Sequence, residues 1–180
     1  MLNSCELSAV GLKPIAAVLQ TGCFGSNVRV VSVERNPLGD AGVVALAGAL
    51  PAHGASLWEL DVADAEVGDD GFVALAAALP NLSNLSKLHC GYNPAGPRGW
   101  SSLAASLPAV PRLNCIYASD SPGMGPAGAE ALIAAVRECG PALRSIQVGR
   151  SGLTAEQEFE LLTARRGPNQ LFVDLGRGYE

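Results

Sequence analysis

Residues 57–79, LWELDVADAEVGDDGFVALAAAL, carry a pattern of apolar positions that the rest of the chain repeats. The first apolar position of the pattern falls at Val28, Leu57, Leu85, Leu113 and Leu143, so the spacings are 29, 28, 28 and 30 residues. A fixed period of this length is typical of solenoids, in which each unit contacts only its neighbours. The sequence therefore predicts a single solenoid domain over residues 1–180.

Four further apolar columns follow the same period. The strand part of the unit gives Val31, Leu60, Leu88, Ile116 and Ile146, then Val33, Val62, Cys90, Ala118 and Val148. The helical part gives Leu46, Leu75, Leu103, Leu132 and Leu161, then Leu50, Leu79, Leu107 and Val136. Full burial of one leucine contributes about 1.5–3 kcal/mol, so we expect these columns to dominate the stability of the chain.

One unit contains both a strand and a helix. Residues 57–62 alternate apolar and polar side chains, which predicts a short half-buried strand, and residues 63–68 form a loop. Acidic Asp69 and Asp70 precede an apolar face with helical spacing, and Pro80 ends the helix. Each helix returns the chain to its starting side, so successive strands are expected to be parallel.

The repeated units resemble leucine-rich repeats, specifically the ribonuclease-inhibitor-like subtype, which has long repeats with full helices. The resemblance rests on residues 28–50, VRVVSVERNPLGDAGVVALAGAL, and on the stretch quoted above. It implies an α/β solenoid, a curved horseshoe with parallel strands on the concave face and helices on the convex face. The expected divisions are a degenerate first repeat at 1–27, repeats at 28–56, 57–84, 85–112, 113–142 and 143–170, and a terminal strand within 171–180.

Two columns depart from the pattern of that family, which usually has Asn or Cys at the turn after the strand. Here the turn holds Asn36 and Asn93, but also Ala65, Ser121 and Ser151. Each replacement is expected to lose a hydrogen bond that contributes about 0.5–1.5 kcal/mol. In the last helix, Gln157 stands where the other helices have Gly42, Gly71, Gly99 and Gly128.

Composition bounds the class of protein. The chain has 48% hydrophobic residues and a mean hydropathy of +0.24, which supports a folded core. A net charge of −5 argues against nucleic-acid binding, and no apolar run approaches the roughly 18 residues of a membrane span. Five cysteines without a C-x-x-C pair, together with the lack of a secretion signal, predict reduced thiols and an intracellular, cytoplasmic location.

One glycine motif resembles a nucleotide-binding fingerprint. Residues 123–128, GMGPAG, match G-x-G-x-x-G and lie between a predicted strand and a predicted helix. However, Gly125 and Gly128 belong to glycine columns that other units share, and no acidic residue ends the next strand, where ribose recognition needs one. The repeat explains the motif, and no cofactor is expected.

A possible catalytic or metal-binding cluster lies on the strands. Asp61, His89 and Tyr117 are predicted to occupy the same outward position in adjacent strands about 4.8 Å apart, with Cys115 near His89. An Asp–His–Cys arrangement could activate a thiolate or contribute zinc ligands. A solvated sheet face offers no oxyanion donors, and a closed zinc site needs four converging ligands. We therefore expect neither an enzyme nor a metal site.

Polar side chains that face outward from the predicted strands and turns form the candidate partner-binding surface. Its members are Glu34, Arg35, Glu59, Asp61, Asp64, Lys87, His89, Tyr92, Tyr117, Asp120, Gln147 and Arg150. Cys115, Asp174 and Arg177 are expected to face the same way. Tyrosines ringed by charges suit a protein interface, but an ordinary solvated sheet face must also be polar, so both interpretations stay open.

The periodicity and the weakness of every catalytic motif predict a non-catalytic protein-interaction or scaffold module. Open solenoid ends normally need polar caps, and none is evident, so a protein partner or a larger assembly is expected to cover the ends or the concave face. The family resemblance also implies an alternative. The chain could regulate an enzyme, as ribonuclease inhibitors and activators of a small nuclear GTPase do.

Overall fold

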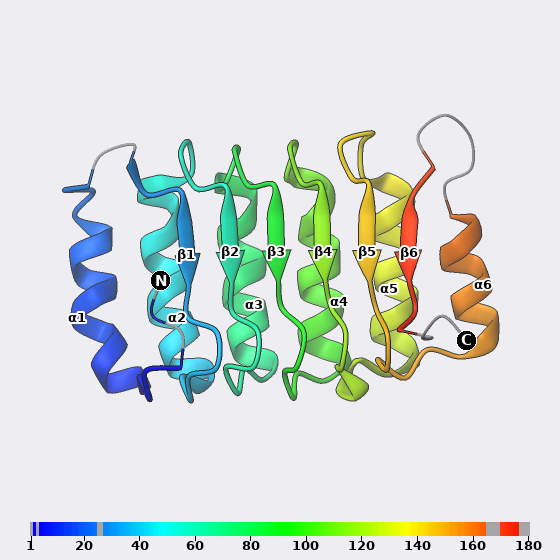
Figure 1. Ribbon diagram of the computed structural model, residues 1–180, viewed down its shortest axis with the longest axis horizontal. Helices are drawn as coiled ribbons and strands as arrows, with labels where there is room; N and C mark the ends of the chain where they lie inside the picture. The colour runs from blue at the N-terminus through cyan, green and yellow to red at the C-terminus, as the bar shows by residue number, and fades with distance from the viewer. Residues whose placement is uncertain (1, 3, 25–26, 165–169, 177–180) are drawn as a thin grey trace.

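A computed structural model describes residues 2, 4–24, 27–164 and 170–176, and it shows a single parallel sheet lined on one side by helices (Figure 1). The strands are β1 (Val30–Ser32), β2 (Glu59–Asp61), β3 (Lys87–His89), β4 (Cys115–Tyr117), β5 (Ser145–Gln147) and β6 (Phe172–Asp174). The α-helices are α1 (Ala9–Gln20), α2 (Gly39–Ala49), α3 (Asp69–Ala78), α4 (Pro97–Ser106), α5 (Gly125–Glu138) and α6 (Ala155–Thr163). Short 3-10 helices are η2 (Leu50–His53), η3 (Leu79–Asn81), η4 (Leu107–Ala109) and η5 (Pro122–Met124).

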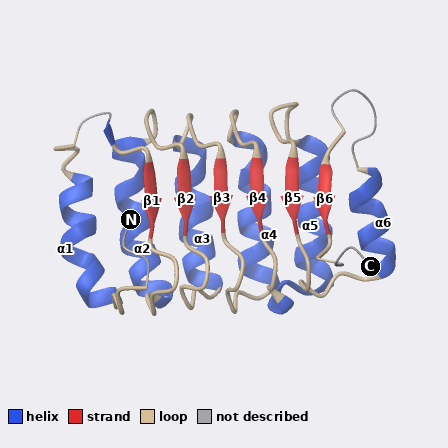
Figure 2. Ribbon diagram, viewed as in Figure 1, coloured by secondary structure: helices blue, strands red, loops and turns tan. Residues whose placement is uncertain are grey.

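The six strands follow their order in the chain, from β1 to β6, and all pairs are parallel. Leu60 stands opposite Leu88, which stands in register with Ile116, so the repeat spacing read from the sequence is the pairing register of the sheet. This arrangement confirms the α/β solenoid with one strand and one helix per unit (Figure 2).

The core lies between the strand layer and the helix layer, where the apolar columns meet. In the first column Val28 is half-buried, whereas Leu57, Leu85, Leu113 and Leu143 are fully buried. Trp100 packs edge-on against Phe72 at a ring-centroid distance of 5.0 Å, so the largest side chains join helices α3 and α4. Cys90 lies in this core, as its column predicts.

Adjacent helices in the first half of the chain are joined by a carboxylate. Asp40 in α2 accepts hydrogen bonds from the backbone N–H groups of Gly68 (2.7 Å) and Gly71 (2.9 Å) at the start of α3. Asp69 in α3 does the same for Gly96 and Gly99 at the start of α4, both at 2.8 Å. The sequence predicts that these acids stabilise their own helix. The structure shows that each also caps the next one, which satisfies N–H groups that the helix itself leaves unpaired.

The second half of the chain lacks these carboxylates. Pro97 and Pro126 replace the capping aspartate, at the first turn where proline fits a helix. Helix α6 caps itself instead, because Thr154 Oγ1 accepts from Gln157 N (3.2 Å) and Gln157 Oε1 accepts from Thr154 N (3.1 Å). Gln157 Nε2 also donates to the backbone oxygen of Pro126 at 3.0 Å. Gln157, which replaces the glycine of the other units, thus joins α6 to α5 through a side-chain hydrogen bond.

The polar ladder at the turn after each strand is partly restored by serine. Asn93 Oδ1 accepts from the N–H groups of Ala65 (3.2 Å) and Val67 (3.0 Å) in the preceding unit. The expectation that serine loses this role is wrong for Ser151, whose hydroxyl donates to Ala118 O (2.8 Å) and accepts from Ser121 N (3.4 Å). A hydroxyl is shorter than an amide but still bridges the two closely spaced turns.

The N-terminal segment extends the sheet edge without forming a regular strand. Leu2 N donates to Ser32 O (2.9 Å) and Ser4 N donates to Glu34 O (3.0 Å), while α1 packs beside α2. Residues 1, 3, 25–26, 165–169 and 177–180 lie outside the described part of the chain, and with them Arg177 and the end of the segment 171–180. Among the described helices, none is long and apolar enough to cross a membrane.

Candidate functional site

A column of left-handed residues follows the strands at one edge of the sheet. Its members after β1 to β5 are Arg35, Asp64, Tyr92, Asp120 and Arg150, with φ values of 56°, 50°, 58°, 55° and 56°. The backbone N–H groups of the first four reach the next unit, for example Asp120 N to Gly149 O at 2.8 Å and Tyr92 N to Ser119 O at 2.9 Å. These bonds hold a conformation that costs an L-residue about 1–2 kcal/mol and that glycine adopts freely.

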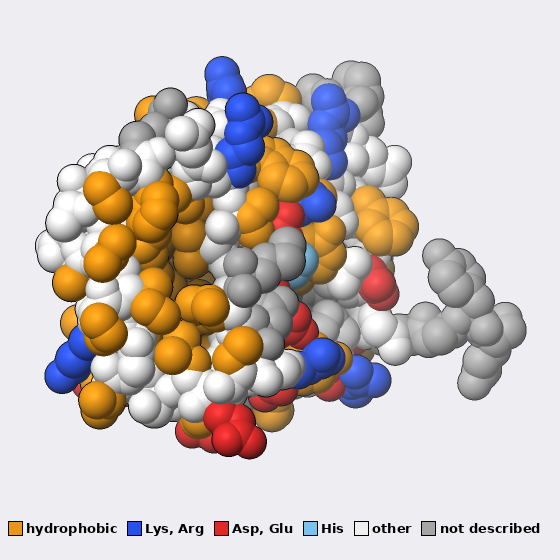
Figure 3. Space-filling model, turned by 60° about the vertical axis from the view of Figure 1, so that its left-hand side comes forward, with side chains coloured by type: hydrophobic (Ala, Val, Ile, Leu, Met, Phe, Trp, Pro, Cys, Tyr) orange, Lys and Arg blue, Asp and Glu red, His pale blue; other side chains and the backbone are white. Residues whose placement is uncertain are grey.

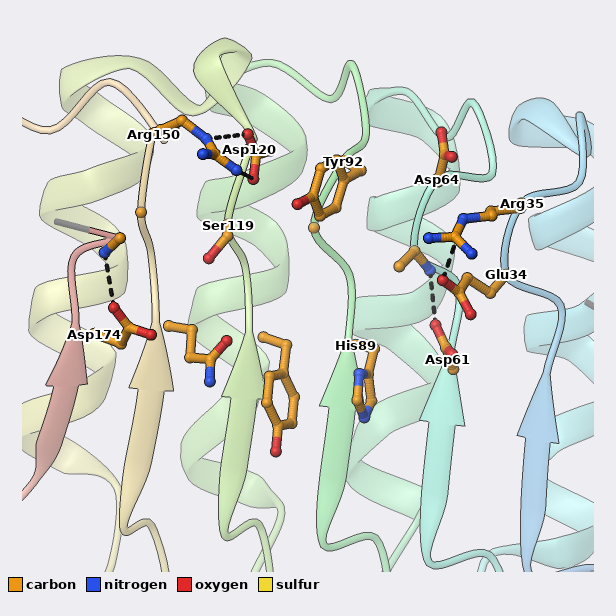
Figure 4. A pocket seen from close by; sticks show the side chains of 16 residues that line it. Glu34, Arg35, Asp61, Asp64, His89, Tyr92, Ser119, Asp120, Arg150 and Asp174 are labelled. Atoms are coloured by element: carbon orange, nitrogen blue, oxygen red, sulfur yellow. Dashed lines mark hydrogen bonds and ion pairs between the residues drawn. The ribbon is translucent and has the colours of Figure 1, made fainter. Parts of the chain in front are cut away.

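The side chains of this column border a hollow of about 580 Å³ over the carboxyl ends of the strands (Figure 4). We call it the carboxyl-end hollow. Its lining residues are Glu34, Arg35, Asp61, Ala63, Asp64, His89, Gly91, Tyr92, Tyr117, Ser119, Asp120, Gln147, Gly149, Arg150, Asp174 and Gly176. The structure therefore brings together most of the residues that the sequence proposes, along all six strands.

Glu59 and Lys87 do not line the hollow, because they lie at the amino ends of β2 and β3. The small residues of the floor, among them Ser119 and Gly91, are not in the predicted surface. Their column directly precedes the left-handed one, so the repeat register could have identified them. After β2 to β5 this column holds small residues, which leave room for the hollow: Ala63, Gly91, Ser119 and Gly149.

Asp120 and Arg150 form a two-pronged ion pair across adjacent units. Arg150 Nε and Nη2 donate to Asp120 Oδ1 and Oδ2 at 2.5 and 2.7 Å (Figure 4). The hydrogen bond from Arg150 lowers the pKa of Asp120, with a further contribution from the Tyr92 side chain. Asp120 in turn raises the pKa of Arg150. Tyr92 itself is 54% exposed, which makes it the most accessible aromatic ring of the hollow.

The charge of the hollow is predominantly negative. Arg35 pairs with Glu34 of its own unit at 3.6 Å, and Arg150 is taken by Asp120. Asp64 is exposed and, within the described residues, has no ion-pair partner. With both arginines occupied, the uncompensated charge is acidic.

Asp61, predicted to face outward as part of the binding surface, is largely buried and has a structural role. Only 8% of its surface is exposed. Its Oδ2 accepts from the hydroxyl of Ser32 (3.0 Å) and its Oδ1 accepts from Ala63 N (3.0 Å). Both carboxylate oxygens thus accept hydrogen bonds from neighbouring residues of the sheet, and these bonds fix the end of β2. Only a small part of the Asp61 surface faces the hollow.

The aromatic floor of the hollow comes from β3 and β4. His89 and Tyr117 stand opposite each other and stack, with ring centroids 4.1 Å apart and an interplanar angle of 13°. Glu59 Oε1 lies 3.5 Å from His89 Nε2. Burial raises the pKa of Tyr117, and the neighbouring Cys115 thiol and the Glu59 carboxylate raise it further. The raised pKa favours the protonated phenol.

The Asp–His–Cys arrangement considered from the sequence is not assembled. Cys115 stands opposite Lys87, and its thiol donates to Asn114 Oδ1 at 3.1 Å, whereas the His89 ring is stacked on Tyr117. Burial, with a contribution from Asp61, raises the pKa of Cys90 to about 12, which disfavours the thiolate form of this buried side chain. In the described residues, no group of three or more His, Cys, Asp or Glu could hold a metal ion.

The glycine motif at residues 123–128 is explained by packing. A Cβ at Gly123 would lie 2.5 Å from Ala95 O, and a Cβ at Gly128 would lie 2.9 Å from the Trp100 Cβ. Gly125 has a φ of +61° at the start of α5. Gly123 and Gly128 thus permit close contact with the preceding unit, and Gly125 permits a left-handed backbone at the start of α5.

Comparisons with known proteins agree with this fold. A family profile described as Leucine Rich repeat matches residues 26–47 and 55–76. No curated protein matches the chain. Leiomodin-1 actin-binding site 2 superposes with a TM-score of 0.70 at 12% identity, over 83% of this chain and 84% of that one. The tropomodulin C-terminal domain from Caenorhabditis elegans superposes with a TM-score of 0.67 at 12% identity, over 85% and 90% of the two chains. At this identity the likeness shows the fold, which is a leucine-rich-repeat solenoid.

Proposed function

We propose that this chain is a non-catalytic protein-binding module whose contact surface is the carboxyl-end hollow. The observation that carries the proposal is the left-handed column: Arg35, Asp64, Tyr92, Asp120 and Arg150 occupy positions where glycine would relieve strain. Strained non-glycine residues gather at sites where the side chain has a role. All five of these side chains line one hollow, and Tyr92 stands exposed among charges, as interface anchors commonly do.

Affinity capture with the full chain tests this proposal. Proteins from the native source that bind the parent chain are identified by mass, and their recovery is compared with that of two variants. Tyr92→Ala removes the exposed ring and is expected to reduce recovery of a true partner at least tenfold. Val73→Ala, an exposed apolar change on helix α3, is the matched control and should leave recovery unchanged.

The proposal fails if no protein is retained, or if Tyr92→Ala and Val73→Ala retain the same proteins equally. Filamentous actin is the first defined partner to test by co-sedimentation, because one structural neighbour is named for an actin-binding site. That likeness is one of fold, so the co-sedimentation result decides whether actin is the partner.

A narrower role is that of an enzyme regulator built on ribonuclease-inhibitor-like repeats. Support comes from the full helix in each unit and from the uncompensated acid in the hollow, which suits a basic enzyme surface. Ribonuclease inhibition and GTPase stimulation, each measured with purified chain, distinguish this role from that of a passive scaffold.

We also propose that a partner or a larger assembly covers the open ends. The N-terminal end exposes an apolar hollow lined by Pro14, Ile15, Val18, Leu19 and Phe24 (Figure 3). At the other end Phe159 and Phe172 are 63% and 57% exposed. Sedimentation of the purified chain tests this: a strictly monomeric, soluble chain at high concentration argues against covered ends.

An intracellular setting would keep the five cysteines, none of which forms a disulfide, as thiols.

A further inference from the structure

A second groove lies at the opposite edge of the sheet, where the strands begin. It has a volume of about 380 Å³, and its lining residues are Trp58, Asn84, Ser86, Arg112, Asn114, Ala142 and Arg144. We call it the basic groove. Figure 3 shows Lys and Arg side chains gathered along this upper edge of the molecule. None of the residues that line the groove is acidic, in contrast to the carboxyl-end hollow.

The cations of the basic groove are not neutralised by carboxylates. Arg112 Nη1 donates to the neutral amide of Asn84 at 2.6 Å, and Arg144 is exposed with no ion pair among the described residues. Just below the groove, the Lys87 ammonium lies 4.6 Å from the centre of the Trp58 ring. Lys87 itself is 3.8 Å from Glu59, so the two arginines are the uncompensated charges.

The groove also presents hydrogen-bond donors rather than acceptors. The side-chain oxygens of Asn84 and Asn114 already accept from Arg112 and from the Cys115 thiol. The backbone oxygens of Trp58 and Ser86 accept from the N–H groups of the next strand. The groove therefore offers a ligand two guanidinium groups and the Trp58 indole, which is 40% exposed. A complementary ligand carries negative charge and hydrogen-bond acceptors.

From these contacts we infer that the basic groove binds an acidic protein segment that crosses the strands. Guanidinium groups bind carboxylates in a two-pronged geometry, and Trp58 offers a flat apolar surface for the aliphatic stems of Glu side chains. A nucleic acid fits less well. Nucleic-acid affinity comes largely from neutralising many phosphates, and this groove has two arginines on a chain with a net charge of −5. This surface is separate from the carboxyl-end hollow, so either can fail without the other.

Fluorescence anisotropy of a labelled hexaglutamate peptide, titrated with the full chain at low ionic strength, tests the inference. The parent chain is expected to bind, and the double variant Arg112→Gln/Arg144→Gln to bind about tenfold more weakly. The matched control is Arg98→Gln/Arg137→Gln, which removes the same charge from the helical side, where both arginines already pair with acids. It should bind like the parent.

The emission of Trp58 gives an independent reading of the same site. Trp100 is buried and Trp58 is exposed, so peptide binding is expected to change the fluorescence emission of Trp58. That change in emission should be absent in Trp58→Phe. The inference is overturned if hexaglutamate does not bind at low salt, or if the two double variants bind equally. It is also overturned if a hexathymidine oligonucleotide of similar charge binds more tightly than the peptide.

Discussion

The two halves of the solenoid join their units with different chemistry on the same geometry. From α2 to α4, Asp40 and Asp69 reach across to the N–H groups of glycines in the next helix. From α4 to α6, prolines replace those acids, and Gln157 supplies the polar link from the later unit back to the earlier one. The first apolar column recurs every 28 to 30 residues through both halves. Apolar packing thus sets the repeat, and the polar links adapt to it.

The largest expected effect concerns the glycines that face a capping carboxylate. In Gly99→Ala the new Cβ would lie 2.7 Å from Asp69 Oδ1 and 2.9 Å from Asp69 Cα, and the backbone atom cannot move aside. We expect a loss of about 1–3 kcal/mol in the free energy of unfolding, measured by urea denaturation. Gly48→Ala is the control. Nothing lies within 4 Å of its Cβ, so it should stabilise α2 by up to about 1 kcal/mol. Equal stability of the two variants would refute the close approach.

A smaller loss is expected when the link itself is removed. Asp69→Ala leaves the N–H groups of Gly96 and Gly99 without their acceptor, which should cost about 1–2 kcal/mol. Asp70→Ala, one residue along, removes only an exposed contact with Arg98 and should change the midpoint of denaturation less. If Asp70→Ala is the more destabilising change, the capping role of Asp69 is wrong.

The second half should be less sensitive to the loss of its polar link. Gln157→Ala removes the side-chain bonds to Thr154 N and Pro126 O, for which we expect about 0.5–1.5 kcal/mol. Thr163→Ala at the end of the same helix provides a control, because its hydroxyl bonds only within α6. A cost for Gln157→Ala above that of Asp69→Ala would reverse the ranking of the two halves.

The smallest effect concerns the edge of the carboxyl-end hollow, where Asp120 and Arg150 link two units while Arg35 pairs within its own. The pKa of Asp120 is lowered in the folded chain from the ordinary aspartate value of 3.8. The ion pair therefore stabilises the fold at pH values above 3.8. That contribution is lost as the pH falls through the lowered pKa. Carboxyl chemical shifts followed by NMR should show the Asp120 pKa rising towards 3.8 in Arg150→Gln. An unchanged pKa would show that the pair is absent in solution.

The sequence predicted the fold well because the signal is periodic. Leu60, Leu88 and Ile116 are in register in the sheet, as their spacing requires, and Pro97 and Pro126 lie in the first turns of their helices. The candidate surface was predicted less completely. Glu59 and Lys87 have the right outward orientation but lie away from the hollow, and Asp61 is held inside by Ser32 and Ala63. The two-residue period of a strand predicts on which face of the sheet a side chain lies. It does not predict how far along the strand the binding surface extends or which groups the side chain contacts.

The strand, loop and helix of each unit, the parallel order of the strands and the buried columns can all be read from the sequence, because they follow from local hydrophobic spacing repeated at a fixed period. The partners of the polar groups, in contrast, depend on how the units stack. Asp69 caps α4 through Gly96, which lies 27 residues later in the chain, and Arg112 donates to Asn84. Five residues adopt a left-handed backbone, and in the first four an inter-unit hydrogen bond supports it. Hydrogen bonds and ion pairs depend on distances of a few ångströms between units, and those distances exist only once the units have stacked.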